Sequence, residues 1–305
     1  MSGDWRSIVE ITAQVSQSKP APEPAFVEAY GSVAADALAG RIDPAFAALA
    51  LTLPTEGDLA REMARNVDPD AIHRTRENLR GALGRAHAEA LTALQAMTAN
   101  ASPFSPDAES AGRRALRNVA LAMVVAGNAV DGADLAYRQI AEADNMSARL
   151  GALTAIAAIP GARREHARQA FARRFAAEPL ILDKWFTLQA QIPEAETLDR
   201  VRELMTHHAF SLRNPNRVRA LIGGFAANAT QFNRADGAGY AFLADIVLEL
   251  DPANPQVAAR LLTAMRSWRS LEPQRQARAE AALRRILAQP ELSADLRDIA
   301  GRSLG

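Results

Sequence analysis

The five histidines of this 305-residue chain are the side chains best suited to metal chemistry. They are His73, His87, His166, His207 and His208. A catalytic zinc site needs three nitrogen or oxygen ligands, and two of them are commonly histidines four residues apart on one helix. No two of these histidines have that spacing, and we interpret His73 and Glu77 as a solvated pair on one helix face. The sequence therefore predicts neither a metal site nor any other cofactor in this chain.

The sequence also lacks the arrangements that activate a nucleophile or hold a phosphate. Cysteine is absent, and no serine stands in a Gly-x-Ser-x-Gly elbow. There is no Gly-x-x-x-x-Gly-Lys loop and no Gly-x-Gly-x-x-Gly turn after a strand. We therefore predict no catalytic residue and no enzymatic activity for this chain alone.

Two arginines, Arg217 and Arg260, stand where a cation needs a partner. Residues 214–216 read Asn-Pro-Asn, which places Arg217 in the first turn of a helix. A positive charge there opposes the helix dipole at a cost of about 0.3–1 kcal/mol. Arg260 lies at the edge of an apolar stripe, about 60° from Val257 on a helical wheel. Each could bind a substrate carboxylate; the alternative is a structural ion pair with one of the 35 acidic residues.

The elements that must position these side chains are helices, because one pattern recurs along the chain. An N-cap residue is followed by proline at the first helical position and then by apolar residues at a period of 3.6. The pattern begins at Asp43-Pro44, Asp68-Pro69, Ser105-Pro106, Asn214-Pro215 and Asn254-Pro255. Strand signals are weak, since no alternating apolar run is closed by an Asn-Gly or Asp-Gly turn. The sequence therefore predicts an all-α fold.

Two apolar stripes show how these helices pack. The stripe after Ser105-Pro106 runs from Leu116 to Gly127 and leaves Arg113 and Arg117 outside it, with Glu109 four residues before Arg113. The stripe after Asn254-Pro255 extends to Leu271. Short helices of this kind bury their faces by pairing in sequence order. We predict an irregular α-solenoid of the HEAT or armadillo kind, with about a dozen paired helices and residues 1–305 in a single domain.

The composition limits the partners of the chain. Its 35 basic and 35 acidic residues cancel, so no net field attracts nucleic acid or an anionic membrane. No segment approaches the roughly 18 uninterrupted apolar residues that a membrane helix requires. The start of the chain lacks a signal-peptide pattern, and the absence of cysteine fits a reducing compartment. We therefore expect a cytoplasmic protein with neither nucleic-acid nor membrane partners.

Several short segments, taken in order and spacing, resemble one known family. The most specific are Asn-Pro-Asn-Arg at 214–217, Asp-Gly-Ala-Gly-Tyr at 236–240 and Asn-Pro-Gln-Val-Ala at 254–258. The others lie at 42–46, 51–54, 116–118, 145–146 and 183–186. Together they resemble the C-terminal helical domain of bacterial aminopeptidase N, a family of zinc exopeptidases of the M1 class. The resemblance covers nearly all of the chain.

The resemblance implies a non-catalytic role in an aminopeptidase of the alanyl type. In that family a preceding catalytic domain carries His-Glu-x-x-His and holds the zinc, and this chain lacks that motif. The helical domain is then expected to pack on the catalytic domain in cis, enclose the active-site chamber and gate short peptide substrates. Arg217 and Arg260 would face the chamber near the C-terminal end of the peptide.

Two questions stay open at this point. An expressed domain, a truncated gene product and a subunit from a split gene all fit the sequence. A free-standing α-solenoid scaffold that binds other proteins through its concave face is the alternative function.

Overall fold

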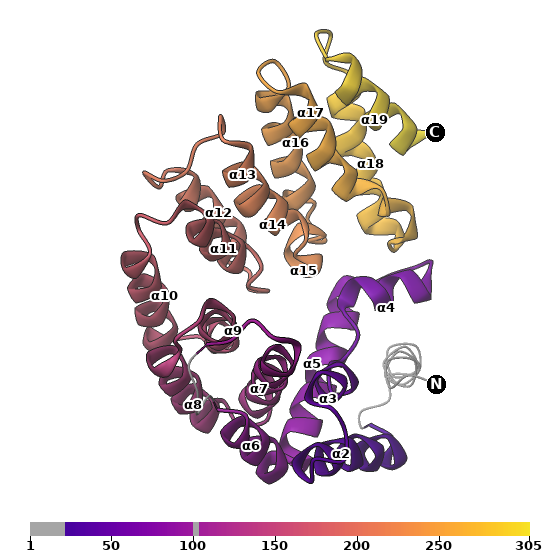
Figure 1. The fold of residues 1–305 in the computed structure, drawn as a ribbon. Helices are drawn as coiled ribbons and strands as arrows, with labels where there is room; N and C mark the ends of the chain where they lie inside the picture. Colours follow the sequence, from indigo (N-terminus) through magenta and orange to yellow (C-terminus); the bar gives the residue numbers. More distant parts are fainter. Residues whose placement is uncertain (1–21, 100–103) are drawn as a thin grey trace. The chain divides into compact units, whose positions relative to one another are not determined.

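Helices account for the regular structure in the computed structural model, which describes residues 22–99 and 104–305. These residues contain no β-strand, and the one isolated bridge in them joins Val67 to Leu271. The prediction of an all-α fold is therefore confirmed (Figure 1). More helical segments occur in these residues than the dozen predicted, and residues 215–232 alone are divided among four short ones.

The chain forms two compact units. Unit 1 comprises residues 22–62 and 71–170, and unit 2 comprises residues 63–70 and 171–305. The short segment 63–70 therefore belongs to unit 2 although unit 1 flanks it on both sides in the sequence. The single domain predicted over residues 1–305 stays a prediction.

Unit 1 is built from helices that pack on their neighbours in sequence. The helix α7 packs on α6 and α8, and α9 packs on both α7 and α8, which is the pairing pattern of a helical repeat. The elements are α2 (Pro24–Leu38), α3 (Pro44–Ala50), α4 (Glu56–Met63), α5 (Pro69–Ala86), α6 (Ala88–Met97), α7 (Ala108–Gly127), α8 (Ala129–Glu142), α9 (Met146–Ala157) and α10 (Ala162–Arg174). The last residue of α4, the first two of α5 and the last four of α10 lie in unit 2.

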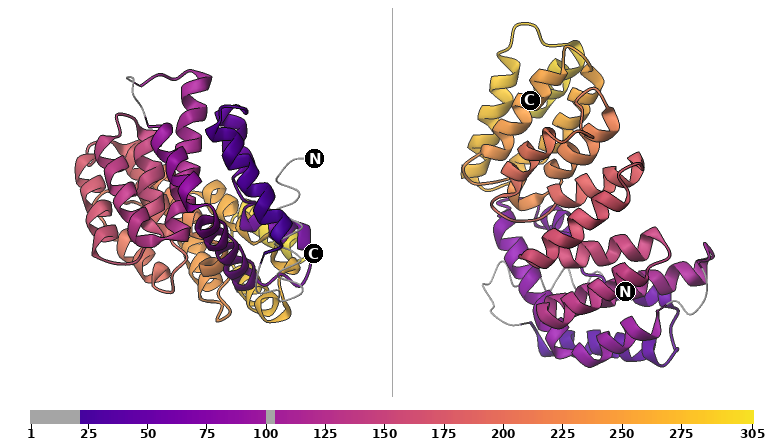
Figure 2. Two further views of the ribbon diagram at one scale, coloured as in Figure 1. Left: turned by 90° about the horizontal axis from the view of Figure 1, so that it is seen from below. Right: turned by 90° about the vertical axis from the view of Figure 1, so that its left-hand side faces the viewer.

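Unit 2 repeats this arrangement with shorter helices. The helix α16 packs on α17 and α18, and α19 packs on both α17 and α18 (Figure 2). The elements are α11 (Pro179–Ala190), α12 (Thr197–Met205), α13 (Pro215–Val218), η1 (Arg219–Gly223), α14 (Gly224–Ala226), α15 (Ala229–Phe232), α16 (Ala238–Leu250), α17 (Pro255–Leu262), η2 (Thr263–Met265), η3 (Trp268–Ser270), α18 (Pro273–Leu287) and α19 (Ala294–Leu304). Three of these segments are not α-helical: η1 is one turn of π-helix, and η2 and η3 are 3₁₀ turns.

Four of the five predicted caps are confirmed and one is wrong. The carboxylate of Asp68 accepts a hydrogen bond from the N–H of Asp70, in the first turn of α5, at 2.9 Å. The side chains of Asp43, Asn214 and Asn254 accept hydrogen bonds from backbone N–H groups in the first turn of the helix that follows each of them. Ser105 does not cap a helix. Asp107 caps α7 instead, because its carboxylate accepts a hydrogen bond from the N–H of Ser110 at 2.8 Å.

The helix predicted after Asn254-Pro255 ends earlier than its apolar stripe. The helix α17 stops at Leu262, and the chain continues through η2 and η3. The hydroxyl of Thr263 donates to the carbonyl of Arg260 at 2.6 Å, and that of Ser270 donates to Ser267 at 2.7 Å. Such local side-chain hydrogen bonds compete with helical ones. The apolar stripe therefore predicts which residues are buried better than it predicts the end of the helix.

The polar edge of α7 differs from the expectation in one residue. Glu109 accepts a hydrogen bond from Arg113 at 2.8 Å, as the spacing of four residues predicts. Arg117, which was expected to lie outside the apolar stripe, is buried, and its guanidinium lies 3.7 Å from the carboxylate of Glu142. The neighbouring helix α8 therefore covers part of the face that lies outside the stripe.

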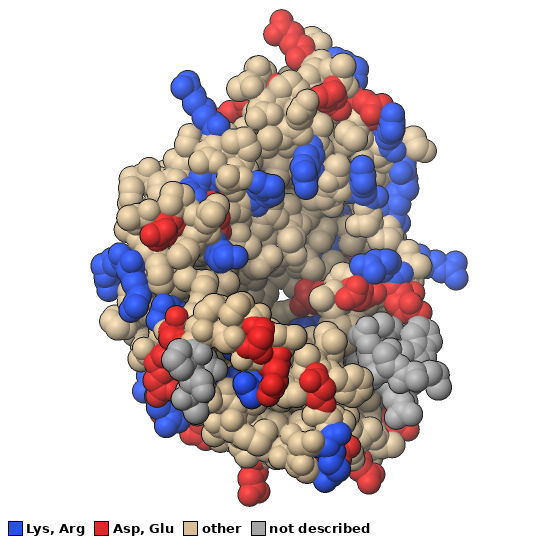
Figure 3. All heavy atoms as spheres, viewed as in Figure 1, with Lys and Arg blue, Asp and Glu red and all other residues tan. Residues whose placement is uncertain are grey.

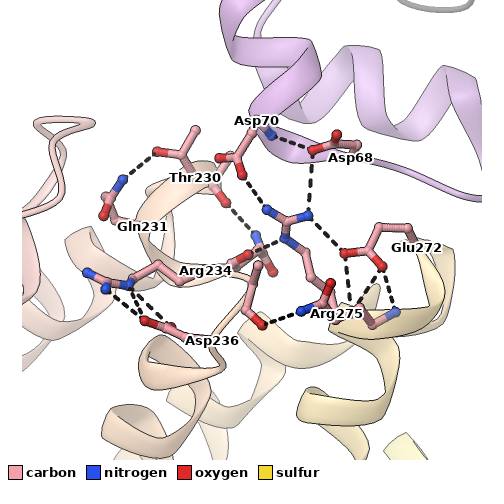
Figure 4. Close-up of polar contacts among 12 residues, drawn as sticks. Asp68, Asp70, Thr230, Gln231, Arg234, Asp236, Glu272 and Arg275 are labelled. Atoms are coloured by element: carbon pink, nitrogen blue, oxygen red, sulfur yellow. Dashed lines mark hydrogen bonds and ion pairs between the residues drawn. The ribbon is translucent and has the colours of Figure 1, made fainter.

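An arginine in α18 holds the segment 63–70 in unit 2 (Figure 4). The side chain of Arg275 is buried, and its guanidinium pairs with Asp70, with Asp68 at 3.6 Å and with Glu272 at 2.8 Å. Two backbone hydrogen bonds of Val67 reinforce this attachment. Its N–H donates to the carbonyl of Ser270 at 2.9 Å, and its carbonyl accepts from the N–H of Glu272 at 3.0 Å. A buried guanidinium needs several acceptors to offset its lost hydration, and here three carboxylates supply them.

Candidate functional site

A cleft in unit 2 is the best candidate for a binding site. It lies between the segment formed by α13, η1 and α14 and the helix α17, and its volume is about 550 Å³. Most of its wall is apolar or small, and two arginines stand in it. The lining residues are Pro215, Arg219, Gly223, Ala226, Ala227, Val257, Arg260, Leu261, Thr263 and Ala264. A mostly apolar cleft with a few charged groups is typical of sites for small ligands.

Arg260 lies in this cleft with its guanidinium available. The residue is exposed and stands in the last turn of α17, where a cation is favoured by the helix dipole. Within the described residues its guanidinium makes no hydrogen bond or ion pair. The structural ion pair that was the alternative for Arg260 is therefore not formed there.

Arg219 supplies the second positive charge of the cleft. It is exposed, and its guanidinium donates a hydrogen bond to the side-chain carbonyl of Asn216, which is a neutral partner. None of the residues that line the cleft in the described part of the chain is acidic. Basic side chains also gather over this part of unit 2 in the view of Figure 3, with acidic side chains mainly toward its edges. The cleft can therefore attract an anion although the whole chain has no net charge.

Arg217 lies in a different environment, although only two residues separate it from Arg219. Its side chain is buried, and its guanidinium pairs with the carboxylate of Asp183. It also donates to the carbonyls of Ala209 and Pro179, each at 2.8 Å. The guanidinium carbon lies 5.7 Å from the ring centre of Phe186, close enough for a cation–π interaction.

This geometry explains the poor electrostatic position of Arg217 in the first turn of α13. The carboxylate of Asp183 supplies the anion that the helix dipole argument requires. The arrangement favours the structural ion pair over a substrate contact. The substrate role of Arg217 stays a prediction.

Sequence reasoning missed Arg219, although a signal for it was present. Successive residues of a helix are rotated by about 100°, so residues two positions apart point to nearly opposite sides. If Arg217 points into the protein, Arg219 therefore points outward. Both arginines are present in the sequence, but the sequence alone does not show which of them is buried.

The histidines form no metal site in the part of the chain that the structure describes. No group of three or more His, Asp or Glu side chains there could hold a metal ion. His73, which was interpreted as a solvated partner of Glu77, instead lies with its Nδ1 2.6 Å from the carboxylate of Glu56. Glu77 accepts hydrogen bonds from Arg80 and Arg76. The described residues of this chain therefore do not fit a zinc ion, which the aminopeptidase resemblance assigns to the catalytic domain.

No helix among the described residues is both long enough and apolar enough to cross a membrane.

The fold and the matched sequence define a helical-repeat domain of the α-solenoid class. A family model described as "Domain of unknown function (DUF3458_C) ARM repeats" matches residues 5–305. The chain belongs to this family, and it is a C-terminal domain of the aminopeptidase N type. The predicted resemblance and the α-solenoid architecture are confirmed.

Curated relatives give the same assignment. Aminopeptidase N of Caulobacter vibrioides is 38% identical over 284 residues, and aminopeptidase N of Escherichia coli is 37% identical over 287 residues. Each alignment covers 93% of this chain and 32% of the relative. The chain therefore spans about a third of the length of these relatives.

A solved structure supports the fold alone. Legionella pneumophila aminopeptidase A in complex with aspartic acid superposes with a TM-score of 0.88 at 24% sequence identity. The match covers 98% of this chain and 36% of that chain.

Proposed function

We propose that this chain is the non-catalytic C-terminal domain of a cytoplasmic M1 zinc aminopeptidase, and that it positions short peptides by binding their C-terminal carboxylate. The zinc belongs to a catalytic domain that acts with this one, normally in cis. The domain would enclose the active-site chamber and limit entry to peptides that can reach the cleft. Its relatives, aminopeptidases about three times as long as the matched region, support this division of labour.

The observation that carries this proposal is the pairing of Arg219 and Arg260 in one cleft without an acidic neighbour. An exopeptidase that removes N-terminal residues presents the other end of its substrate as a carboxylate. A guanidinium binds a carboxylate with two parallel N–H donors, so each arginine can recognise that group. The apolar walls can contact the side chains that precede the carboxylate.

A binding experiment on the purified chain tests the cleft directly. Trialanine and its C-terminal amide differ only in the carboxylate, and both can be titrated into isotope-labelled chain while amide shifts are followed by NMR. We expect the free peptide to bind more tightly than the amide. An exposed arginine–carboxylate contact contributes up to about 1 kcal/mol, so Arg219→Ala and Arg260→Ala should each weaken peptide binding about threefold to fivefold.

The matched control is Arg138→Ala. It removes one positive charge from an exposed helical position that does not line the cleft. Peptide affinity should be unchanged by it. Equal binding of peptide and amide by the wild-type chain, or an equal loss in all three variants, would exclude a carboxylate site in the cleft.

A free-standing interaction scaffold is the competing function. The observation that favours it is the helix α3, where the side chains of Phe46 and Leu49 are 58% and 75% exposed, three residues apart. An upstream reading frame that encodes His-Glu-x-x-His in continuity with this chain would support the aminopeptidase. If the motif is absent both from the upstream reading frame and from any separately encoded subunit, the scaffold function is favoured.

A further inference from the structure

The backbone that carries Arg219 is a π-turn, η1, inserted between α13 and α14. Such turns are rare and often occur at functional sites. On its inner side Ala220, Leu221 and Ile222 are buried, while Arg219 on its outer side is exposed in the cleft. A π-turn holds one residue more than an α-helical turn of the same height. If it relaxed into regular α-helix, the side chains at one end would rotate by about 100° relative to the other end.

The helix α11 holds this turn from behind. The hydroxyl of Thr187 lies 3.0 Å from the carbonyl of Ala220 within η1 and 3.0 Å from the carbonyl of Asp183 in its own helix. One helical turn earlier, the carboxylate of Asp183 pairs with Arg217, just before η1. A Cβ added to Gly224, just after η1, would lie 3.3 Å from the Cα of Thr187, so the two backbones pack closely.

We infer that Thr187 is a positioning residue for the arginine cleft. Its hydroxyl donates one proton between the carbonyls of Ala220 and Asp183, and this bridge keeps η1 in the π conformation. The π conformation directs Arg219 toward the cleft that Arg260 also lines. The Asp183–Arg217 pair fixes the start of the same segment. Thr187 itself does not line the cleft, so it acts through the backbone. The inference rests on the proposed carboxylate site and adds the residue that shapes it.

Two substitutions separate the hydroxyl of Thr187 from its packing. Thr187→Val keeps the shape and removes the donor, whereas Thr187→Ser keeps the donor. The full chain is titrated with trialanine and its amide, and hydrogen exchange is followed at the amides of residues 219–224. In Thr187→Val we expect the preference for the carboxylate to fall at least threefold and exchange in this segment to accelerate at least tenfold. Thr187→Ser should keep both the carboxylate preference and the exchange rates close to those of the wild type.

The control is Thr52→Val. The hydroxyl of Thr52 donates to the carbonyl four residues earlier in the chain at 2.7 Å, as in many helices, and bonds no second element. This variant should leave the peptide preference and the exchange of residues 219–224 unchanged.

The outcomes distinguish this inference from the proposed function. A wild-type chain without a carboxylate preference contradicts the proposed function and removes the basis of the inference. A wild-type preference that Thr187→Val retains contradicts the inference alone. So does a loss of preference that Thr187→Ser fails to restore, because the hydroxyl would then not be the cause.

Discussion

The guanidinium of Arg217 and the carboxylate of Asp183 form a largely buried ion pair that joins α13 to α11. The side chain of Arg217 is 7% exposed and that of Asp183 is 18% exposed. Two residues further along the chain, Arg219 is exposed and lines the cleft. One short segment thus supplies a structural arginine and a ligand-binding candidate, and their substitutions should have different consequences.

Arg217→Ala should reduce stability much more than Arg219→Ala. Removing one partner of a buried ion pair leaves the other charge without compensation, at a cost of about 3–5 kcal/mol. Because Asp183 is partly exposed, we expect about 3 kcal/mol for Arg217→Ala. Arg219→Ala should change the free energy of unfolding by less than about 0.5 kcal/mol. Urea denaturation of both variants checks this. A loss for Arg217→Ala as small as the one expected for Arg219→Ala would show that the Arg217 pair does not stabilise the fold.

The ion pair between His73 and Glu56 should make stability depend on pH. The hydrogen bond to Glu56 raises the pKa of His73 above its ordinary value of about 6.5, although burial opposes the shift. The pair therefore stabilises the fold fully below pH 6.5, and this contribution is lost as the pH rises through the folded-state pKa. The difference in melting temperature between wild type and His73→Gln should shrink between pH 5.5 and 8.5.

The control for this pH dependence is His208→Gln at an exposed position. Its difference in melting temperature from wild type should vary less over the same range. A His73→Gln difference that stays constant with pH would mean that the charged form of His73 contributes nothing to stability.

Ala64→Gly should stabilise the protein. Ala64 has a φ of 62°, in the left-handed region that costs an L-residue roughly 1–2 kcal/mol, whereas glycine adopts it freely. Glycine also has more conformational entropy than alanine in the unfolded state, which offsets part of this benefit. We therefore expect a net gain in folding stability of about 0.5 kcal/mol. The same change at the exposed helical position Ala281 should cost about 1 kcal/mol. Thermal unfolding of both variants tests the contrast in sign.

Gly84→Ala should destabilise unit 1, because α5 and α7 touch there through their backbones. A Cβ at Gly84 would lie 2.3 Å from the carbonyl oxygen of Met123 and 2.7 Å from the nitrogen of Gly127. Overpacking of this kind costs roughly 1–3 kcal/mol or more. Gly301 in α19 is a matched control, since a Cβ there meets nothing within 4 Å. Gly301→Ala should be neutral or stabilising by about 0.5–1 kcal/mol. Equal effects of the two changes on the denaturation midpoint would contradict the close crossing.

The sequence by itself determined the helical class and much of its local detail. Caps such as Asp43, Asn214 and Asn254 act within three residues of the chain, so the residue types alone define them. The pair between Glu109 and Arg113 is local for the same reason. The sequence also placed Arg260 at the edge of an apolar stripe, and the structure places it in the cleft.

Only the tertiary structure decided which side chains meet across helices. The partner of His73 is Glu56, seventeen residues earlier, and the partner of Arg217 is Asp183, thirty-four residues earlier. Helical periodicity gives the face on which a side chain lies, but not the helix that will cover that face. A buried charge needs a partner at a few ångströms, and this distance depends on how distant helices pack. The structure, rather than the sequence, therefore assigns Arg217 to the protein interior and Arg219 to the cleft.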